Sequence, residues 1–207
     1  MFSNLFHLDN PIWVFMGRLA DLALLTGLWF VCCIPVVTIG ASVKALYTVA
    51  MQMTKDEEGY TAASFFRAFR KDFKESTLLG FFVLVPGVFL GSDLYVYGKM
   101  EGPAGTVLFT VFLILTLVYL MTLAYVYPLS AASDYRGRAL VPAAFVAACK
   151  NPGWAVLLAV IMGCAVLLGI FVCAPLLAVG MGLAAYVQCK IVLFLIKNYH
   201  IRTAFKE

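Results

Sequence analysis

The chain has 207 residues, of which 63% are hydrophobic and 13% are charged, and its mean hydropathy is +0.96. Soluble domains contain about 45–50% apolar and about 25% charged residues, and a domain of this size buries only ~70% of the surface of its unfolded chain. The excess apolar surface must face lipid, which excludes a soluble domain. We predict that residues 1–207 form a single all-α domain, a polytopic transmembrane helical bundle.

The first apolar segments predict an N-terminal helical hairpin over residues 11–53. A long segment at 11–37 is followed directly by a less apolar one at 39–53, and a proline and a glycine within 33–40 interrupt the helix between them. The same spacing of Cys, Pro and Gly recurs at 173–180, between two other apolar segments. This repeat favours a second span at 39–53, which gives six spans. The alternative, an interfacial helix at the same place, gives five.

A basic amphipathic helix is predicted at residues 60–76. Its phenylalanines are Phe65, Phe66, Phe69 and Phe73, and its cations are Arg67, Arg70, Lys71 and Lys74. At helical spacing these two sets lie on different faces, so we expect the phenylalanines in the lipid and the cations on anionic phosphates. The helix is then either a topological anchor or a docking surface for a partner on the cytoplasmic side.

Two further helical hairpins are predicted in the rest of the chain, at residues 78–127 and 154–197. Their spans are residues 78–97, 104–127, 154–173 and 176–197. Each of these segments has close to the ~20 apolar residues that a bilayer core requires. Pro86 is expected to kink the first of them, because proline cannot donate the backbone hydrogen bond of a helix interior.

The basic residues are distributed asymmetrically between the two sides of the six-span arrangement. Only Lys44 and Lys99 fall on the outer side, whereas the other Lys and Arg residues fall on the cytoplasmic side. This asymmetry predicts a multi-pass protein of the bacterial plasma membrane with a cytoplasmic C-terminus. The net charge of +4 is then matched by anionic lipid headgroups, and nucleic acid is not expected as a partner.

Polar side chains inside the spans are scarce, and they are the remaining candidates for a functional site. These residues are Arg18, Asp21, Lys44, Asp93, Gln188 and Lys190. An ionisable group within a membrane is a functional hypothesis by default. The structural interpretation is a neutralising pair of Arg18 with Asp21, lysines that extend toward the headgroups, and hydrogen bonds between helices.

Motifs of known catalytic chemistry are missing from the sequence. There is no phosphate-binding loop, no zinc-protease motif and no nucleophile elbow, and the six cysteines contain no Cys-x-x-Cys pair. We therefore expect no catalytic residue, no metal and no cofactor, and a protein that is not an enzyme.

Several short motifs in the first third of the chain resemble the YesL-like family. They are DNPIW at 9–13, LADL at 19–22, CCIPVVTIGAS at 32–42, ALY at 45–47, DEEGY at 56–60 and SFFRAF at 64–69. Members of this family are membrane proteins of Gram-positive bacteria and are grouped as a domain of unknown function. They are typically encoded beside carbohydrate ABC importers, sugar-responsive two-component regulators and polysaccharide-degrading enzymes. The resemblance implies a partner in sugar uptake or sensing, and it carries over no catalytic residue.

Three functions remain open at this point. The first is a non-enzymatic accessory protein that associates with carbohydrate ABC transporter subunits or a sensor kinase. The second is a small independent transporter or channel, which requires polar residues that converge on a water-accessible cavity. The third is a lipid-binding protein that organises the membrane.

Overall fold

The computed structural model describes residues 11–55, 59–132, 140–171 and 174–198, and this part of the chain is helical without any strand. Its elements are α1 (Pro11–Cys33), the short 3₁₀ helix η2 (Val36–Thr38), α2 (Ile39–Thr54), α3 (Thr61–Lys71), α4 (Phe73–Tyr97), α5 (Pro103–Ala132), α6 (Leu140–Lys150), α7 (Pro152–Phe171) and α8 (Ala174–Asn198). The predicted all-α class is confirmed.

The turn between α1 and α2 is closed by hydroxyl groups. The Thr38 and Ser42 hydroxyl oxygens lie 2.6 and 3.0 Å from the Cys32 carbonyl oxygen at the end of α1. The last carbonyls of a helix have no partner within the helix, so these two donors satisfy a group that would otherwise be left unpaired. The chain can therefore reverse direction within a few apolar residues.

The shorter helix α2 lies at the centre of the molecule. It contacts α1, α3, α4, α5 and α8, and its buried residues are Gly40, Ala41, Ser42, Ala45, Leu46, Tyr47, Val49, Ala50 and Met51. The helix has only 16 residues and is not among the described helices that are long and apolar enough to cross a membrane. The predicted second span at 39–53 is therefore not confirmed, and the alternative, an interfacial helix, does not describe a helix that its neighbours surround.

The number of spans differs from the prediction. Four described helices are long and apolar enough to cross a membrane, namely α1 over Met16–Cys33, α4, α5 and α8 over Gly180–Lys197. A fifth span is possible if α6 and α7 count together, although they are bent by 111° at the break before Pro152. Proline starts α7 because it has no N–H to continue the hydrogen bonds of α6. Six spans are not confirmed.

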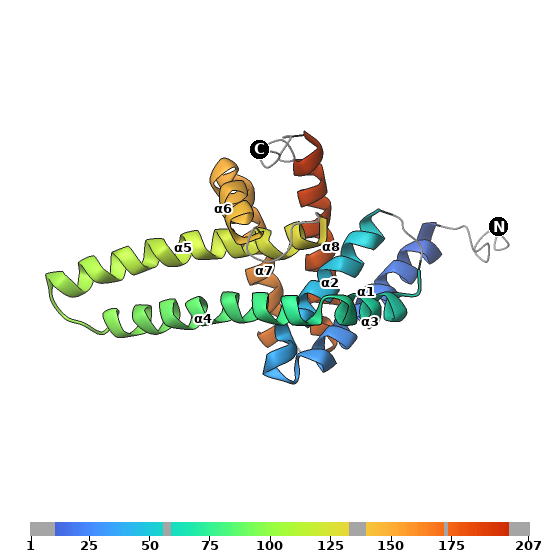
Figure 1. Ribbon diagram of the computed structural model, residues 1–207, viewed down its shortest axis with the longest axis horizontal. Helices are drawn as coiled ribbons and strands as arrows, with labels where there is room; N and C mark the ends of the chain where they lie inside the picture. The colour runs from blue at the N-terminus through green and yellow to red at the C-terminus, as the bar shows by residue number, and fades with distance from the viewer. Residues whose placement is uncertain (1–10, 56–58, 133–139, 172–173, 199–207) are drawn as a thin grey trace.

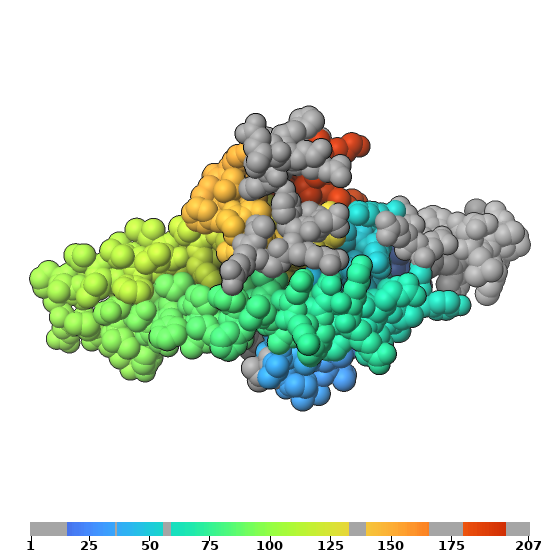
Figure 2. All heavy atoms as spheres, viewed as in Figure 1, coloured from blue at the N-terminus to red at the C-terminus, as the bar shows by residue number. Residues whose placement is uncertain are grey.

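The hairpin of α4 and α5 projects from the rest of the molecule. In Figure 1 it runs across the direction of α7 and α8, and Figure 2 shows it extending beyond the other helices. Little of either helix is buried within the protein, and α4 exposes large aromatic residues such as Phe81, Phe82 and Phe89. A continuous apolar surface of this kind is unfavourable in water, which supports contact of the hairpin with lipid.

Candidate functional site

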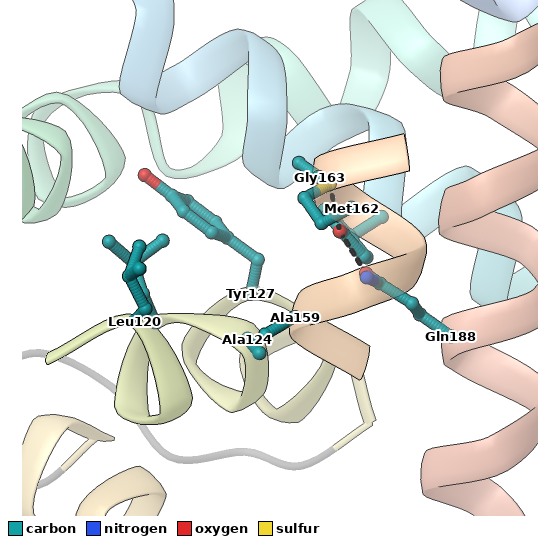
Figure 3. Close-up of a pocket in the computed structure, with 9 residues that line it drawn as sticks. Leu120, Ala124, Tyr127, Ala159, Met162, Gly163 and Gln188 are labelled. Atoms are coloured by element: carbon teal, nitrogen blue, oxygen red, sulfur yellow. Dashed lines mark hydrogen bonds between the residues drawn. The ribbon is translucent and has the colours of Figure 1, made fainter. Parts of the chain in front are cut away.

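A cavity of about 360 Å³ lies between α2, α5, α7 and α8. It is lined by Tyr47, Leu120, Leu123, Ala124, Tyr127, Ala159, Met162, Gly163 and Gln188. Figure 3 shows Leu120, Ala124 and Tyr127 reaching it from α5, Ala159, Met162 and Gly163 from α7, and Gln188 from α8. Most of the lining is hydrocarbon, and its polar side chains come from only three residues.

Two of the three polar side chains of this cavity, those of Tyr47 and Gln188, are paired with each other. The Tyr47 hydroxyl donates to Oε1 of Gln188, and Nε2 of Gln188 donates to the Leu158 carbonyl at 2.9 Å. The rings of Tyr47 and Tyr127 stack with their centroids 5.9 Å apart. Because a buried amide without partners costs about 1–3 kcal/mol, this pairing allows Gln188 to sit in the core at 1% exposure. It also links α2, α7 and α8.

The sequence predicted Gln188 as a candidate residue but missed Tyr47. Tyr47 falls within the ALY motif at 45–47 that contributes to the family resemblance. A buried tyrosine requires a partner for its hydroxyl, and a buried glutamine on another helix could supply it. That signal was present, but nothing in the sequence indicated that the two residues meet.

We had predicted that Lys44 extends outward to the headgroups, but it does not. Its Nζ lies 3.3 Å from Oδ2 of Asp72, at the junction of α3 and α4. Both side chains are mostly buried, with 17% and 20% exposure. The assignment of Lys44 to the opposite side of the membrane from the basic helix is therefore wrong, because its ammonium group contacts the carboxylate that directly follows α3.

The other predicted polar residues lie apart from the cavity. Asp21 accepts a hydrogen bond from the Thr61 hydroxyl at 3.0 Å, where α3 begins. Arg18 and Lys190 are exposed on α1 and α8, and Asp93 is partly exposed on α4. Of the predicted polar residues, only Gln188 lines the cavity. A polar pathway for a transported solute would require these residues to converge on the cavity, and they do not.

The phenylalanines of α3 do not share one environment. Phe65 is fully buried and belongs to the same apolar cluster as Leu46 and Met51 of α2, and Phe69 packs partly against this cluster. Phe66 and Phe73 remain exposed. The predicted helix at 60–76 is also two elements, since α3 ends at Lys71 and α4 starts at Phe73. The inner face of α3 therefore packs on protein, where we had expected lipid.

The cations of α3 and of the first turn of α4 all point away from this packing. Arg67, Arg70, Lys71 and Lys74 are exposed, and Figure 2 shows this part of the chain at the molecular surface. We call these four residues the basic face. Thr61 at one end of α3 and Asp72 at the other tie the helix to α1 and α2, so the basic face is held on a fixed support.

Metal ligands do not gather in the described part of the chain. No group of three or more His, Cys, Asp or Glu residues there could hold a metal ion. The cysteines described as free are Cys32, Cys33, Cys149, Cys164 and Cys189. Cysteine in these apolar helices packs as a small hydrophobic residue.

Comparison with known proteins bears on the same elements. A family model described as "Protein of unknown function, DUF624" matches residues 22–94. The uncharacterized protein YesL of Bacillus subtilis (strain 168) is 28% identical over 151 residues, which cover 72% of this chain and 71% of that protein. Over these residues the chain is similar to that family and to YesL. No solved structure matches it.

The part of the chain that matches the family model contains α2, α3 and nearly all of α4. It therefore includes the central helix, the basic face and the ion pair of Lys44 with Asp72. The cavity is completed by Tyr127 and Gln188, which lie outside the matched residues. The support of the basic face thus lies in the region of family similarity, whereas Tyr47 is the single lining residue of the cavity that this region contributes.

Proposed function

We propose that this YesL-like chain is a non-enzymatic accessory protein of the bacterial plasma membrane. It associates with carbohydrate ABC transporter subunits or with a sugar-sensing kinase through the basic face of α3, and its C-terminus lies in the cytoplasm. The carbohydrate link rests on the family resemblance, and the cytoplasmic C-terminus rests on the distribution of Lys and Arg in the sequence.

The fixed position of the basic face is the observation that carries this proposal. A helix that only anchored the chain would place its aromatic residues in the lipid. Here Phe65 is buried against α2, and Asp21 and Lys44 bind the two ends of α3. Four exposed cations on a preorganised helix suit a binding surface, because little conformational entropy is lost when a partner docks.

The composition of this surface also favours a protein partner. Phe66 is 44% exposed beside Arg67 and Arg70. Arginine and aromatic residues are enriched where proteins associate, and Phe66, Arg67 and Arg70 are of these types. An acidic surface on the partner would match the charge of the basic face and accelerate its association.

The character of the cavity fits an accessory role in sugar uptake. A sugar is bound through many hydrogen bonds, and the amide of Gln188 and the hydroxyl of Tyr47 are already paired with each other. The remaining lining is mostly aliphatic and aromatic carbon. Recognition of the sugar is therefore assigned to the partner.

Affinity purification from native membranes in a mild detergent, with quantitative mass spectrometry, tests the proposal. We expect importer subunits or a sensor kinase to be recovered with the natural protein and lost from the double variant Arg67→Gln with Arg70→Gln. Lys150→Gln with Lys197→Gln is the matched control, since it removes two exposed cations from other helices. Recovery of the protein alone, or equal recovery with both variants, would contradict the proposal.

A further inference from the structure

The cavity between α5 and α7 has a closed end and an exposed rim. Tyr47 and Gln188 are 2% and 1% exposed and form the closed end. Leu120 of α5 is 48% exposed, and Gly163 of α7 is also exposed, so these two lining residues form the rim. The space is therefore a blind pocket that is entered between two helices.

The surface around this rim is apolar. Leu117, one turn before Leu120 on α5, is 50% exposed, and Val160, one turn before Gly163 on α7, is 54% exposed. Helix α5 is long and apolar enough to cross a membrane. In a bilayer this rim would face lipid hydrocarbon, because apolar surface is unfavourable in water.

The interior of the pocket also favours an apolar ligand. Its volume of about 360 Å³ exceeds the roughly 150 Å³ that suffices for an apolar cavity in another protein to bind benzene. The donors and acceptors of Tyr47 and Gln188 are committed to each other and to the Leu158 carbonyl. An empty apolar cavity lowers stability in proportion to its volume, and a hydrocarbon chain would recover those contacts.

We infer that this cavity binds the hydrocarbon tail of a membrane lipid, which enters between Leu120 and Gly163 and ends against Tyr47 and Tyr127. The tail contributes to the packing of α2, α5, α7 and α8 around it. The inference does not depend on the proposed partner, because the pocket and the basic face use different residues and the test below contains only protein and lipid.

Photo-crosslinking in vesicles tests this site. The purified protein is reconstituted into vesicles of phosphatidylethanolamine and phosphatidylglycerol that contain phosphatidylethanolamine with a diazirine in one acyl chain. Labelled residues are then mapped by mass spectrometry. We expect labelling of Tyr47 or Tyr127, which are 2% and 7% exposed and out of reach of bulk lipid on the protein surface.

The variant Gly163→Leu is designed to fill the entrance. A Cβ placed at Gly163 meets no atom within 4 Å, so the first carbon of the new side chain causes no clash. We expect tyrosine labelling to fall about tenfold, the loss expected when about two methylene groups can no longer be buried. Gly153→Leu is the matched control on the same helix, since its Cβ also meets nothing within 4 Å and it lies outside the cavity.

Labelling of Val160 in each sample reports on insertion, because this residue is 54% exposed at the surface of the protein. Labelling confined to outward residues such as Val156 and Val160, or tyrosine labelling that Gly163→Leu leaves unchanged, would overturn the inference. A parallel sample with the diazirine on a free fatty acid separates the two sources of the tail. Stronger tyrosine labelling by the phospholipid supports a bilayer lipid as the ligand. Labelling by the fatty acid alone would overturn this and show that the ligand is a free fatty acid.

Discussion

Gly40 of α2 and Gly80 of α4 leave no space for a side chain where their helices cross. A Cβ placed at Gly40 would lie 2.6 Å from the Gly80 Cα, which is far shorter than any ordinary carbon contact. This approach brings the start of α2 directly against α4. Small residues at such crossings let helices in a membrane pack through their backbones, where no hydrophobic driving force between helices is available.

Gly40→Ala is therefore expected to destabilise the protein. The added methyl meets backbone atoms on α4, which cannot move aside as a side chain can, and overpacking of this kind costs about 1–3 kcal/mol. The thermal unfolding midpoint of the detergent-solubilised protein should fall. Gly91→Ala on α4 is the control, because a Cβ there meets nothing within 4 Å. Equal midpoints for the two variants would contradict the close crossing.

Removal of one partner from the Lys44 and Asp72 pair should loosen the junction of α3 and α4. The pair is mostly buried, so Lys44→Ala leaves a carboxylate with little water, and we expect a loss of about 1–3 kcal/mol, less than for a fully buried pair. Thermal unfolding of both single variants and of the double variant Lys44→Ala with Asp72→Ala gives the coupling energy. A coupling energy of zero would show that the contact does not stabilise α3.

The hydrogen bond from Tyr47 to Gln188 predicts non-additive substitutions. Tyr47→Phe leaves the Gln188 oxygen without its partner, and Gln188→Leu leaves the Tyr47 hydroxyl with only the weak acceptor Sδ of Met162, 3.7 Å away, so each is expected to cost about 1–3 kcal/mol. Replacing both removes the two polar groups together, and the double variant should be more stable than the sum of the single losses implies. Strict additivity in thermal unfolding would argue against a shared hydrogen bond.

Phe65 and Phe66 are adjacent in the sequence but differ in what they contact. Phe65 is fully buried against α2, whereas Phe66 is exposed. Phe65→Ala should cost about 3–5 kcal/mol through the cavity it creates, and Phe66→Ala should change thermal stability little in detergent. Equal and small effects at both positions would contradict the packing of Phe65 on α2 and would favour the interfacial helix that the sequence suggested.

Much of the secondary structure could be predicted from hydropathy. The expected span at 104–127 lies within α5 (Pro103–Ala132), and the expected span at 176–197 lies within α8 (Ala174–Asn198). Long uncharged segments have few alternatives to a helix, because lipid offers no partners for backbone polar groups. The bend between α6 and α7 was not predicted, although Pro152 cannot continue the backbone hydrogen bonds of a preceding helix and so indicated a break there.

The candidate site was harder to predict than the helices. Gln188 was recognised because an amide in an apolar segment is conspicuous, but its partner Tyr47 is 141 residues away in the chain. Lys44 was assigned to a headgroup because Asp72 is close to it only in the folded chain. Pairings between distant residues are set by the packing of whole helices, which local composition does not specify.

The sequence by itself determined that this chain is all-α, with helices long and apolar enough to cross a membrane and an amphipathic basic segment. Only the tertiary structure decided that α2 lies at the centre and that Phe65 faces protein. The physical reason is that lipid and protein interior are both apolar, so periodicity shows which residues share a face but not what covers that face. That choice depends on how closely the helices can approach, as Gly40 and Gly80 allow here.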